Sequence, residues 1–171
     1  MNVSEAIETR LEIRTYKDRP VGPEAISDIL EAGRLAPSGR NFQHWRFIVI
    51  EDADRLAALA DHSPTGQWIG EAPLAIAICT DPQYDYHEID AGRAVTNMQL
   101  AAWERGIGSC IFTVGEPAAA ELLEIPDSYR LTLVAGFGYP TVQPEGRKDR
   151  KPIDAIAFEE TFGTPIDRDQ E

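Results

Sequence analysis

The cations of this sequence are concentrated in two short stretches whose residue types suit an anion. The first, TRLEIRTY, holds Arg10 and Arg14, and the second, EGRKDRKP, holds four cations at positions 147, 148, 150 and 151. Both stand against a net charge of −13, with 29 acidic and 16 basic residues. Guanidinium and ammonium groups match the oxygens of phosphate, so the pattern indicates an anion site. The alternative is a solvated turn whose cations balance nearby acids.

A third stretch, LAPSGRNFQHW at residues 35–45, carries more polar and aromatic side chains than a plain turn needs. Ser38 and Gly39 let the backbone turn closely. Asn41 and Gln43 offer both hydrogen-bond donors and acceptors, which can recognise the edge of a planar heterocycle. The alternative is a capped helix end with Trp45 packed into the core.

The sequence lacks the usual patterns of catalytic and metal-binding residues. His44, His62 and His87 are far apart, and no His or Cys has the spacing of a metal site. Neither a nucleophile elbow nor a phosphate loop is present, and Gly136-Phe-Gly138 is interpreted as a turn rather than a dinucleotide fingerprint. If the protein is an enzyme, we expect a cofactor to carry its chemistry.

Composition predicts one soluble globular domain over the 171 residues, of which 43% are hydrophobic. The sequence has no apolar run long enough to span a membrane and no signal-peptide pattern at its start. The two cysteines, Cys79 and Cys110, lie in apolar runs and are expected to be buried free thiols in a reducing cytoplasm. The acidic charge argues against nucleic acid and anionic membranes as partners. The low Lys content is compatible with a salt-adapted source, although a GC-rich genome also favours Arg over Lys.

Apolar periodicity predicts an α+β or α/β domain around one central sheet. Ser4 is expected to cap a short first helix, and Pro23 to begin a second that Pro37 terminates. The other predicted helices run from Asp52 to Ala60, from about Glu88 to Arg105, and after Pro117; the predicted strands are 46–50, 73–80, 109–113 and 131–137. The tail beyond residue 150 either reaches a partner subunit or is a loosely packed terminus.

Taken in order, five segments of the chain resemble the successive signatures of the nitroreductase family. They are RLEIRTYKDRPV, ILEAGRLAPSGRNFQHWRFIVI, GQWIGEAPLAIAICTD, DAGRAVTNMQLAAWERGIGSC and KDRKPIDAI. They extend from residue 10 to residue 156, and the APSxxNxQxW and K-x-R-x-P patterns are the most specific parts.

The resemblance implies an α+β nitroreductase-like fold, with a central mixed or antiparallel sheet flanked by helices in an intertwined homodimer. Residues 1–171 would form one FMN-binding domain, with the tail from about residue 152 to 171 reaching the partner. The protein would be a cytoplasmic enzyme that takes electrons from NADH or NADPH and passes them to a nitroaromatic, a quinone or a similar small acceptor by a ping-pong mechanism. No nucleic acid or membrane partner is implied.

The family motifs assign cofactor contacts to particular residues of this chain and no catalytic residue, since the flavin carries the chemistry. Arg147 and Lys151 match no family position and are interpreted as solvated. The residues that would face the phosphate and ribityl side are Arg10, Leu11, Glu12, Arg14, Lys148 and Arg150. The other subunit would contribute Pro37, Ser38, Gly39 and Asn41. The residues near the ring system would be Gln67, Cys110, Ile111 and Phe112.

Two positions depart from the family pattern. Glu12 stands where the family often has Ser, and a carboxylate would repel phosphate unless it points away or pairs with an Arg. His44 replaces a Pro and is either a titratable group near the flavin or a surface histidine; the surface position is the favoured expectation. The connection DPQYDYHEI is short, so the site is expected to be open, and Tyr84 and Tyr86 either stack on an acceptor or are plain loop aromatics.

Other functions remain open at this point. One is different flavin chemistry on the same scaffold, such as reductive dehalogenation or flavin cleavage, and another is a non-catalytic flavin-binding protein. The sequence identifies neither the natural acceptor nor the preference between NADH and NADPH.

Overall fold

A four-stranded antiparallel sheet with the strand order β1-β2-β4-β3 forms the centre of the protein. The computed structural model describes residues 1–112, 114–115, 117–142, 144–146 and 148–166. The strands are β1 (Arg46–Ile50), β2 (Leu74–Thr80), β3 (Gly108–Phe112) and β4 (Arg130–Gly138). The helices are α1 (Val3–Thr9), α2 (Pro23–Arg34), α3 (Ala53–Asp61), α4 (His87–Glu104) and α5 (Ala118–Leu122), with short 3-10 turns η1 (Gly39–Asn41), η2 (Gln67–Glu71) and η3 (Ile153–Ala155).

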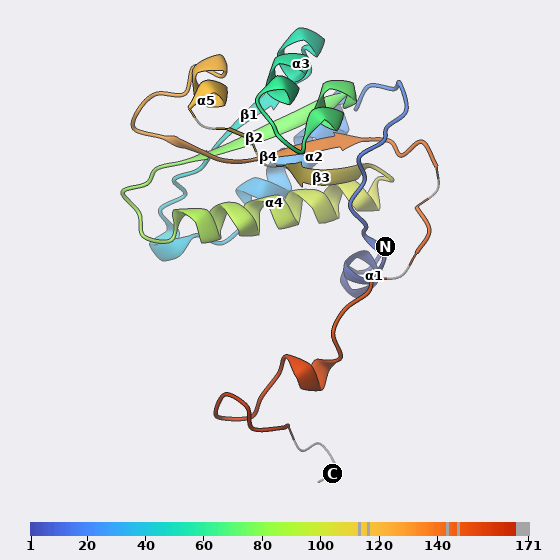
Figure 1. Cartoon of the computed structure of the whole chain (residues 1–171), viewed down its shortest axis with the longest axis vertical. Coiled ribbons are helices and arrows are strands. Elements are labelled where there is room, and N and C mark those ends of the chain that lie inside the picture. The colour runs from blue at the N-terminus through green and yellow to red at the C-terminus, as the bar shows by residue number, and fades with distance from the viewer. Residues whose placement is uncertain (113, 116, 143, 147, 167–171) are drawn as a thin grey trace.

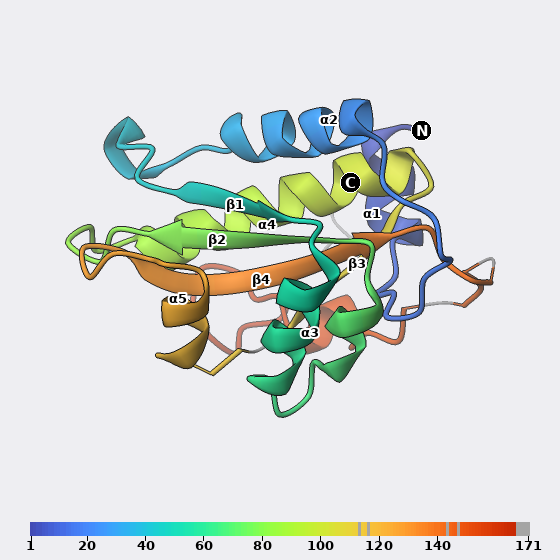
Figure 2. The same ribbon diagram turned by 90° about the horizontal axis from the view of Figure 1, so that it is seen from above.

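Helices cover both faces of the sheet, as Figure 2 shows with α2 and α4 on one side and α3 and α5 on the other. The central strand β2 explains this arrangement, because all seven of its residues are buried. Its even-numbered residues from Leu74 to Ile78 pack with α2 and α4, and its odd-numbered residues from Ala75 to Cys79 pack with α3 and η2. A strand with two apolar faces requires cover on both, so the predicted α+β class with a central sheet is confirmed.

Most predicted elements occur within a residue or two of their expected bounds. Pro23 is the first residue of α2, Asp52 caps α3 by accepting from Arg55 N at 2.9 Å, and α4 stops before Gly106, whose φ is +72°. The predicted third strand ends at Phe112 in the structure, and Thr113 lies outside the described residues.

Two local expectations were wrong. The first helix is capped by Asn2, whose Oδ1 accepts from Glu5 N at 2.9 Å, rather than by Ser4. Gly136-Phe-Gly138 is the end of strand β4 and not a turn. Glycine is needed there for close packing, because a Cβ at Gly136 would lie 2.5 Å from Ile69 Cδ1.

The chain leaves the body of the molecule after residue 150. Figure 1 shows this tail, with η3, extending away from the sheet and its helices. Its side chains from residue 151 to 166 are exposed or half-buried, and Phe162 keeps 95% of its surface accessible. Of the described helices, none is both long and apolar enough to cross a lipid bilayer.

Candidate functional site

The extended segment after α1 runs beside strand β3 and brings the first cation stretch to the edge of the sheet. Glu12 forms a parallel bridge with Ser109, and Ile13 N donates to Ser109 O at 3.0 Å. Further along, the Tyr16 hydroxyl donates to Ile13 O at 2.6 Å, and Tyr16 bridges Pro140. Residues of this segment therefore alternate between two surroundings, as in a strand.

Arg10 and Glu12 form an ion pair on this segment, with Arg10 Nη2 at 2.6 Å from Glu12 Oε1. The other terminal nitrogen of Arg10, Nη1, is buried and has no hydrogen-bond partner. A buried guanidinium donor without an acceptor is costly. The arrangement answers the question about Glu12: the carboxylate pairs with an Arg, and one donor of that Arg remains for another acceptor.

The second cation stretch lies next to the first, although about 140 residues separate them in sequence. Lys148 Nζ donates to the carbonyl oxygen of Ile7 in α1. Partial burial, followed by the neighbouring charges of Arg10 and Arg150, lowers the pKa of Lys148. Cations that disturb one another in this way form a local positive field, which favours the anion-site interpretation over a solvated turn. Arg147 lies outside the described residues, and Lys151 is exposed as expected.

Strand β3 exposes only one of its three predicted residues. Ile111 is 41% exposed, whereas Cys110 and Phe112 are buried, so only Ile111 offers its side chain at the surface. Burial raises the pKa of Cys110 to about 11, followed by the nearby Glu12, while the Arg14 guanidinium acts in the opposite direction. Cys110 is therefore a protonated thiol at neutral pH, and Arg14 lies close enough to influence it. Both cysteines are buried, as predicted.

Gln67 lies beside the end of strand β3. It begins η2 and is exposed, and its neighbour Gly66 packs closely against β3. A Cβ on Gly66 would lie 2.6 Å from Phe112 Cδ2. The structure therefore brings together six of the predicted residues, namely Arg10, Glu12, Arg14, Cys110, Lys148 and Arg150. Ile111 and Phe112 continue along β3, and Gln67 lies beside the Phe112 end of that strand.

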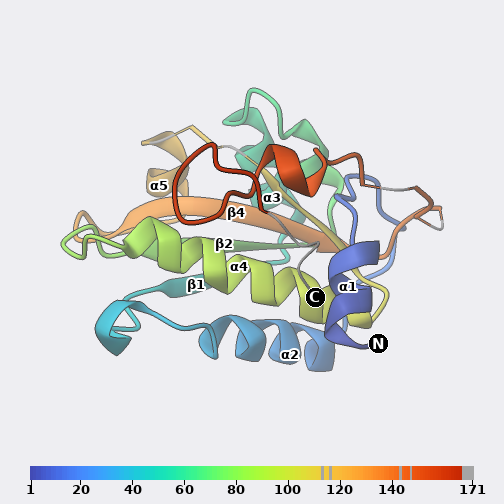
Figure 3. The same ribbon diagram turned by 90° about the horizontal axis from the view of Figure 1, so that it is seen from below.

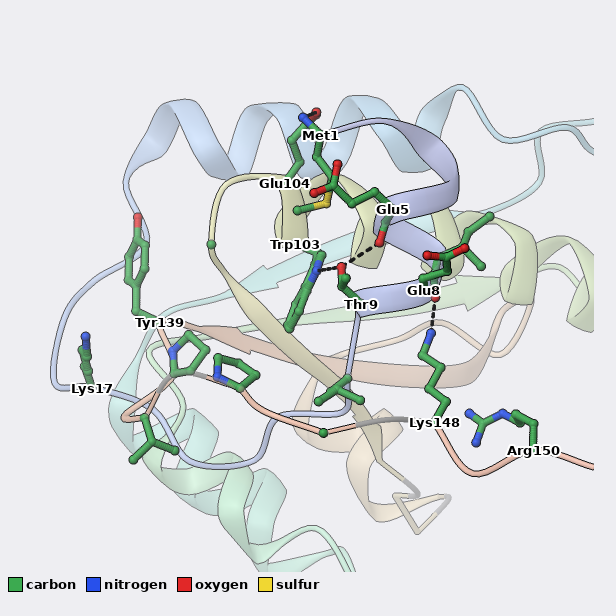
Figure 4. A pocket seen from close by; sticks show the side chains of 17 residues that line it. Met1, Glu5, Glu8, Thr9, Lys17, Trp103, Glu104, Tyr139, Lys148 and Arg150 are labelled. Carbon is green, nitrogen blue, oxygen red and sulfur yellow. Dashed lines mark hydrogen bonds and ion pairs between the residues drawn. The ribbon is translucent and has the colours of Figure 1, made fainter.

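A cavity of about 1170 Å³ opens beside this cluster (Figure 4). Leu11, Lys148 and Arg150 line it, but Arg10, Glu12 and Arg14 do not, because they alternate with Leu11 along the segment. Its lining also carries Glu5, Glu8 and Glu104, together with Lys17 (Figure 4). The N-terminal ammonium of Met1 pairs with Glu104 at 3.3 Å. The cation cluster therefore lies at the rim of this cavity, whose lining carries charges of both signs.

A second group of predicted residues lies at the N-terminal end of α4. It consists of Pro37, Ser38, Gly39 and Asn41. Three residues of this loop have positive φ, with Arg40 at 50°, Asn41 at 60° and Gln43 at 51°. Ser38 Oγ accepts from Gln43 N at 3.0 Å. The loop is therefore a tight, internally bonded turn, as its composition predicted, and Trp45 is buried in the core behind it.

The two groups of predicted residues are separated along the long helix. Gly39 is bound to Asp90 in the first turn of α4, and Thr9, next to Arg10, is bound to Trp103 in the last turn. The 13-residue separation of Asp90 and Trp103 corresponds to about 20 Å along the helix axis. A single chain therefore holds the cation cluster and the 37–41 loop at opposite ends, as Figure 2 shows.

The prediction that His44 is a surface residue was wrong. His44 is only 4% exposed, and its ring lies 5.3 Å from that of Tyr84 in a stacked arrangement. Phe42 also packs on Tyr84 at 4.5 Å. These rings and the exposed Tyr86 line a small cavity of about 290 Å³.

Sequence reasoning missed two buried polar residues. Asp90, in α4, accepts from Gly39 N and from His44. Ser109, in β3, has a buried hydroxyl with no hydrogen-bond partner. The sequence signal that could have drawn attention to Asp90 is an acidic residue at a position where the apolar pattern of the helix expects a buried side chain. No group of three or more His, Cys, Asp or Glu among the described residues is arranged to hold a metal ion.

The fold and this site together define an α+β protein with a cluster of cations beside one edge of an antiparallel sheet. Comparisons with known proteins then give the family. The model of the Nitroreductase family matches residues 7–67 and 60–139, and the chain belongs to that family.

Individual relatives agree with this assignment. A provisionally named NADH dehydrogenase/NAD(P)H nitroreductase of Archaeoglobus fulgidus is 39% identical over 144 residues, which cover 78% of this chain and 83% of that protein. Among solved structures, an FMN-dependent nitroreductase of Clostridium difficile is 31% identical, with a TM-score of 0.83 and coverage of 90% and 96%. A protein of Parabacteroides distasonis, with the same provisional name as the Archaeoglobus relative, gives 30% identity, a TM-score of 0.86 and coverage of 93% and 98%.

Proposed function

We propose that this protein is an FMN-dependent oxidoreductase that takes electrons from NADH or NADPH. Its acceptor would be a nitroaromatic, a quinone or a similar small molecule, reduced by a ping-pong mechanism. The observation that carries the proposal is the buried Arg10 Nη1, which lacks an acceptor in the middle of a cation cluster. The names of the relatives, which include NAD(P)H nitroreductase and FMN-dependent nitroreductase, support the same function.

The residues present fit the phosphate of FMN. Arg10, Lys148 and Arg150 bring three positive charges together, and Arg14 adds a fourth near Cys110. In a chain of net charge −13, such a reversal of sign has a clear use only for an anion. The unpartnered Nη1 of Arg10 would gain a charge-assisted hydrogen bond from a phosphate oxygen. Leu11 faces the neighbouring cavity instead, so we expect any contact it makes to the cofactor to come from its backbone.

When bound, FMN supplies the centre that accepts and donates a hydride. The protein's own part is to bind and orient it and to stabilise charge. Arg14 is exposed beside β3, where its guanidinium can stabilise negative charge that develops during the transfer. Ile111 offers an apolar surface against one face of the ring system. Cys110 stays protonated and has no redox part in this proposal.

We propose that residues 1–171 form one domain and that the flavin site is completed by a second copy of this chain. The separation of about 20 Å between the cation cluster and the 37–41 loop supports this arrangement. An uncovered row of side chains on α4, with Ile89, Arg93 and Thr96 all exposed, offers a surface for the second copy. The apolar side chains of the tail support its reaching the partner; the most exposed are Ile153, Ile156 and Phe162. The two buried thiols support a reducing, cytoplasmic location.

The small cavity beside the 37–41 loop supports an aromatic acceptor. Phe42 and Tyr86 both expose ring surface there, and a planar ring can stack on either. The choice between NADH and NADPH has no support from a particular residue and is left to kinetics.

The proposal is tested by adding FMN to the purified protein and titrating the complex anaerobically with NADH or NADPH. We expect a yellow complex that is bleached by one of the two donors and recovers its colour when a nitroaromatic or quinone is added. Parallel lines in double-reciprocal plots of the initial rate, taken at several fixed acceptor concentrations, would support the ping-pong mechanism. A protein that binds no FMN would contradict the proposal, and one that binds FMN but is bleached by neither donor would be a flavin-binding protein without this activity.

A further inference from the structure

One buried carboxylate connects residues 38–44 to the long helix α4. This segment, the 38–44 loop, overlaps the 37–41 loop and ends at His44. Asp90 is 1% exposed, and its Oδ2 accepts from Gly39 N at 2.8 Å and from His44 Nε2 at 3.2 Å. Its other oxygen, Oδ1, lies 3.6 Å from Arg93 Nη1, and the Arg93 side chain is half exposed. Asp90 thus fixes the loop at two points, at its first turn and at its end.

The loop needs such a restraint because of its backbone conformation. Between Gly39 and His44, three non-glycine residues adopt positive φ, a region that L-residues enter at a cost. Two backbone bonds, from Asn41 N to Ser38 O and from Phe42 N to Gly39 O, close the turn locally. The bonds from Gln43 N to Ser38 Oγ and from Gln43 Nε2 to Asn41 O are exposed to water. These bonds all lie within the loop, so the part-buried bond from Gly39 N and the buried bond from His44, both to Asp90, are the ones that tie the loop to α4.

His44 is suited to the second point of attachment. Its Nε2 must carry a hydrogen to donate to Asp90, which leaves Nδ1 as an acceptor in the neutral ring. Nδ1 is buried and has no hydrogen-bond partner. The ring is held from one side by Tyr84 and from another by Trp45, at 5.3 Å and 5.8 Å between centroids. The family pattern usually has a proline at this position, whose ring restricts the backbone. In this chain the histidine side chain instead forms a hydrogen bond to α4.

We propose that Asp90, held by His44, is a positioning residue that fixes the 38–44 loop in the one conformation competent to contact the flavin of the partner subunit. This inference rests on the proposed function for its consequence but not for its geometry. A loop that visits the competent conformation only part of the time binds with an affinity reduced by that fraction. Loss of Asp90 should therefore weaken flavin binding without removing any atom that touches the flavin.

The first measurement concerns the loop alone and uses the protein without cofactor. Hydrogen exchange at the Gly39 amide should be slow in the wild type and at least about tenfold faster in Asp90→Leu, which has a similar size and no acceptor. Asp90→Asn should keep most of the protection, because its amide oxygen can take the position of Oδ2 and accept from both donors. Equal exchange rates in the wild type and Asp90→Leu would overturn the inference.

The second measurement is the Kd for FMN, by quenching of flavin fluorescence. We expect a rise of about tenfold or more in Asp90→Leu, a rise of at most about threefold in Asp90→Asn, and an intermediate effect in His44→Phe, which keeps the stacking on Tyr84 and loses the donor. The visible circular dichroism of the bound flavin should change in the same order. Leu59→Val, on the opposite face of the sheet, is the stability control: it should lower the melting temperature and leave the Kd unchanged.

The outcomes separate this inference from the proposed function. A wild type that takes up no FMN contradicts the function, and hydrogen exchange then decides the positioning role alone. A wild type that binds FMN with an affinity that Asp90→Leu and His44→Phe leave unaltered contradicts the positioning role and leaves the function standing. A Kd that follows the melting temperature across all variants, Leu59→Val included, also contradicts it.

Discussion

Arg10 and Glu12 are paired at 2.6 Å, and this pair occupies one side of the guanidinium while its other terminal nitrogen is buried without a partner. Glu12 therefore competes with any anion for Arg10. Both side chains keep part of their surface in water, 21% for Arg10 and 40% for Glu12, so the effect is screened and modest.

Replacing Glu12 by Gln should tighten FMN binding. The substitution removes a negative charge next to the phosphate and leaves an amide oxygen that Arg10 can still contact. We expect a gain of about 0.5–1 kcal/mol, which fluorescence titration at low salt would measure. The gain should shrink as salt is added, because exposed charges are screened. Weaker binding by Glu12→Gln would show that the carboxylate orients Arg10 rather than opposing the anion.

Replacing Arg150 by Ala should weaken FMN binding by about 1.5–3 kcal/mol if the guanidinium makes a charge-assisted bond to phosphate. Arg150 is exposed, and its Nη1 donates to the backbone oxygen of its neighbour Asp149 at 2.7 Å, so the cofactor-free protein should melt at an unchanged temperature. Lys151→Ala is the matched control, since it removes one nearby charge that we assign to solvent. Equal losses in both variants would mean that the effect is long-range and that Arg150 has no direct contact.

Cys110 should make the protein less stable at alkaline pH. Burial raises the pKa of this thiol from 9.0 to about 11. Between these values the unfolded chain loses the proton and the folded chain keeps it, so the free energy of unfolding falls as pH rises. We expect the wild type to lose about 1–2 kcal/mol relative to Cys110→Ala between about pH 8.5 and pH 11, measured by urea unfolding of both proteins.

The same thiol should be unreactive towards a disulfide reagent at pH 7.5 in the folded protein. Cys110→Ala should also retain electron transfer from NADH or NADPH to an acceptor, because no step is assigned to the sulfur. Rapid labelling of Cys110 at neutral pH would contradict the raised pKa.

Removal of the tail should weaken the proposed dimer. A chain ending at Pro152 loses the exposed apolar residues of the tail, and analytical ultracentrifugation should show a shift from dimer to monomer at micromolar concentration. The double variant Ile156→Ser and Phe162→Ser in the full chain tests whether apolar contact, rather than tail length, is responsible. A truncated chain that stays dimeric would place the interface on the helices alone.

Elements whose signals are local could be predicted from the sequence. Strand β2 is apolar on both faces, α2 begins at Pro23, and α4 stops before Gly106, and each of these features depends on a few neighbouring residues. The convergence of the two cation stretches was implied by the family resemblance, whereas charge alone left a solvated turn as the alternative.

Features that depend on distant residues were missed. His44 is buried because Asp90, 46 residues later, supplies an acceptor for it, and no pattern around His44 reports this. Gly136 and Gly138 belong to a strand because Ile69, Trp68 and Pro73 pack against them, whereas local rules assign such a Gly pair to a turn. The first helix is capped by Asn2 rather than Ser4, because two residues of capping type lie within three positions.

The distance of about 20 Å between the cation cluster and the 37–41 loop has a consequence for how the cofactor is retained. Under the proposed arrangement each flavin bridges two chains, so loading with FMN and assembly of the dimer are linked by mass action. Dilution should then release flavin, and added FMN should raise the association constant of the chains. The colour of the protein would report its concentration as well as its occupancy.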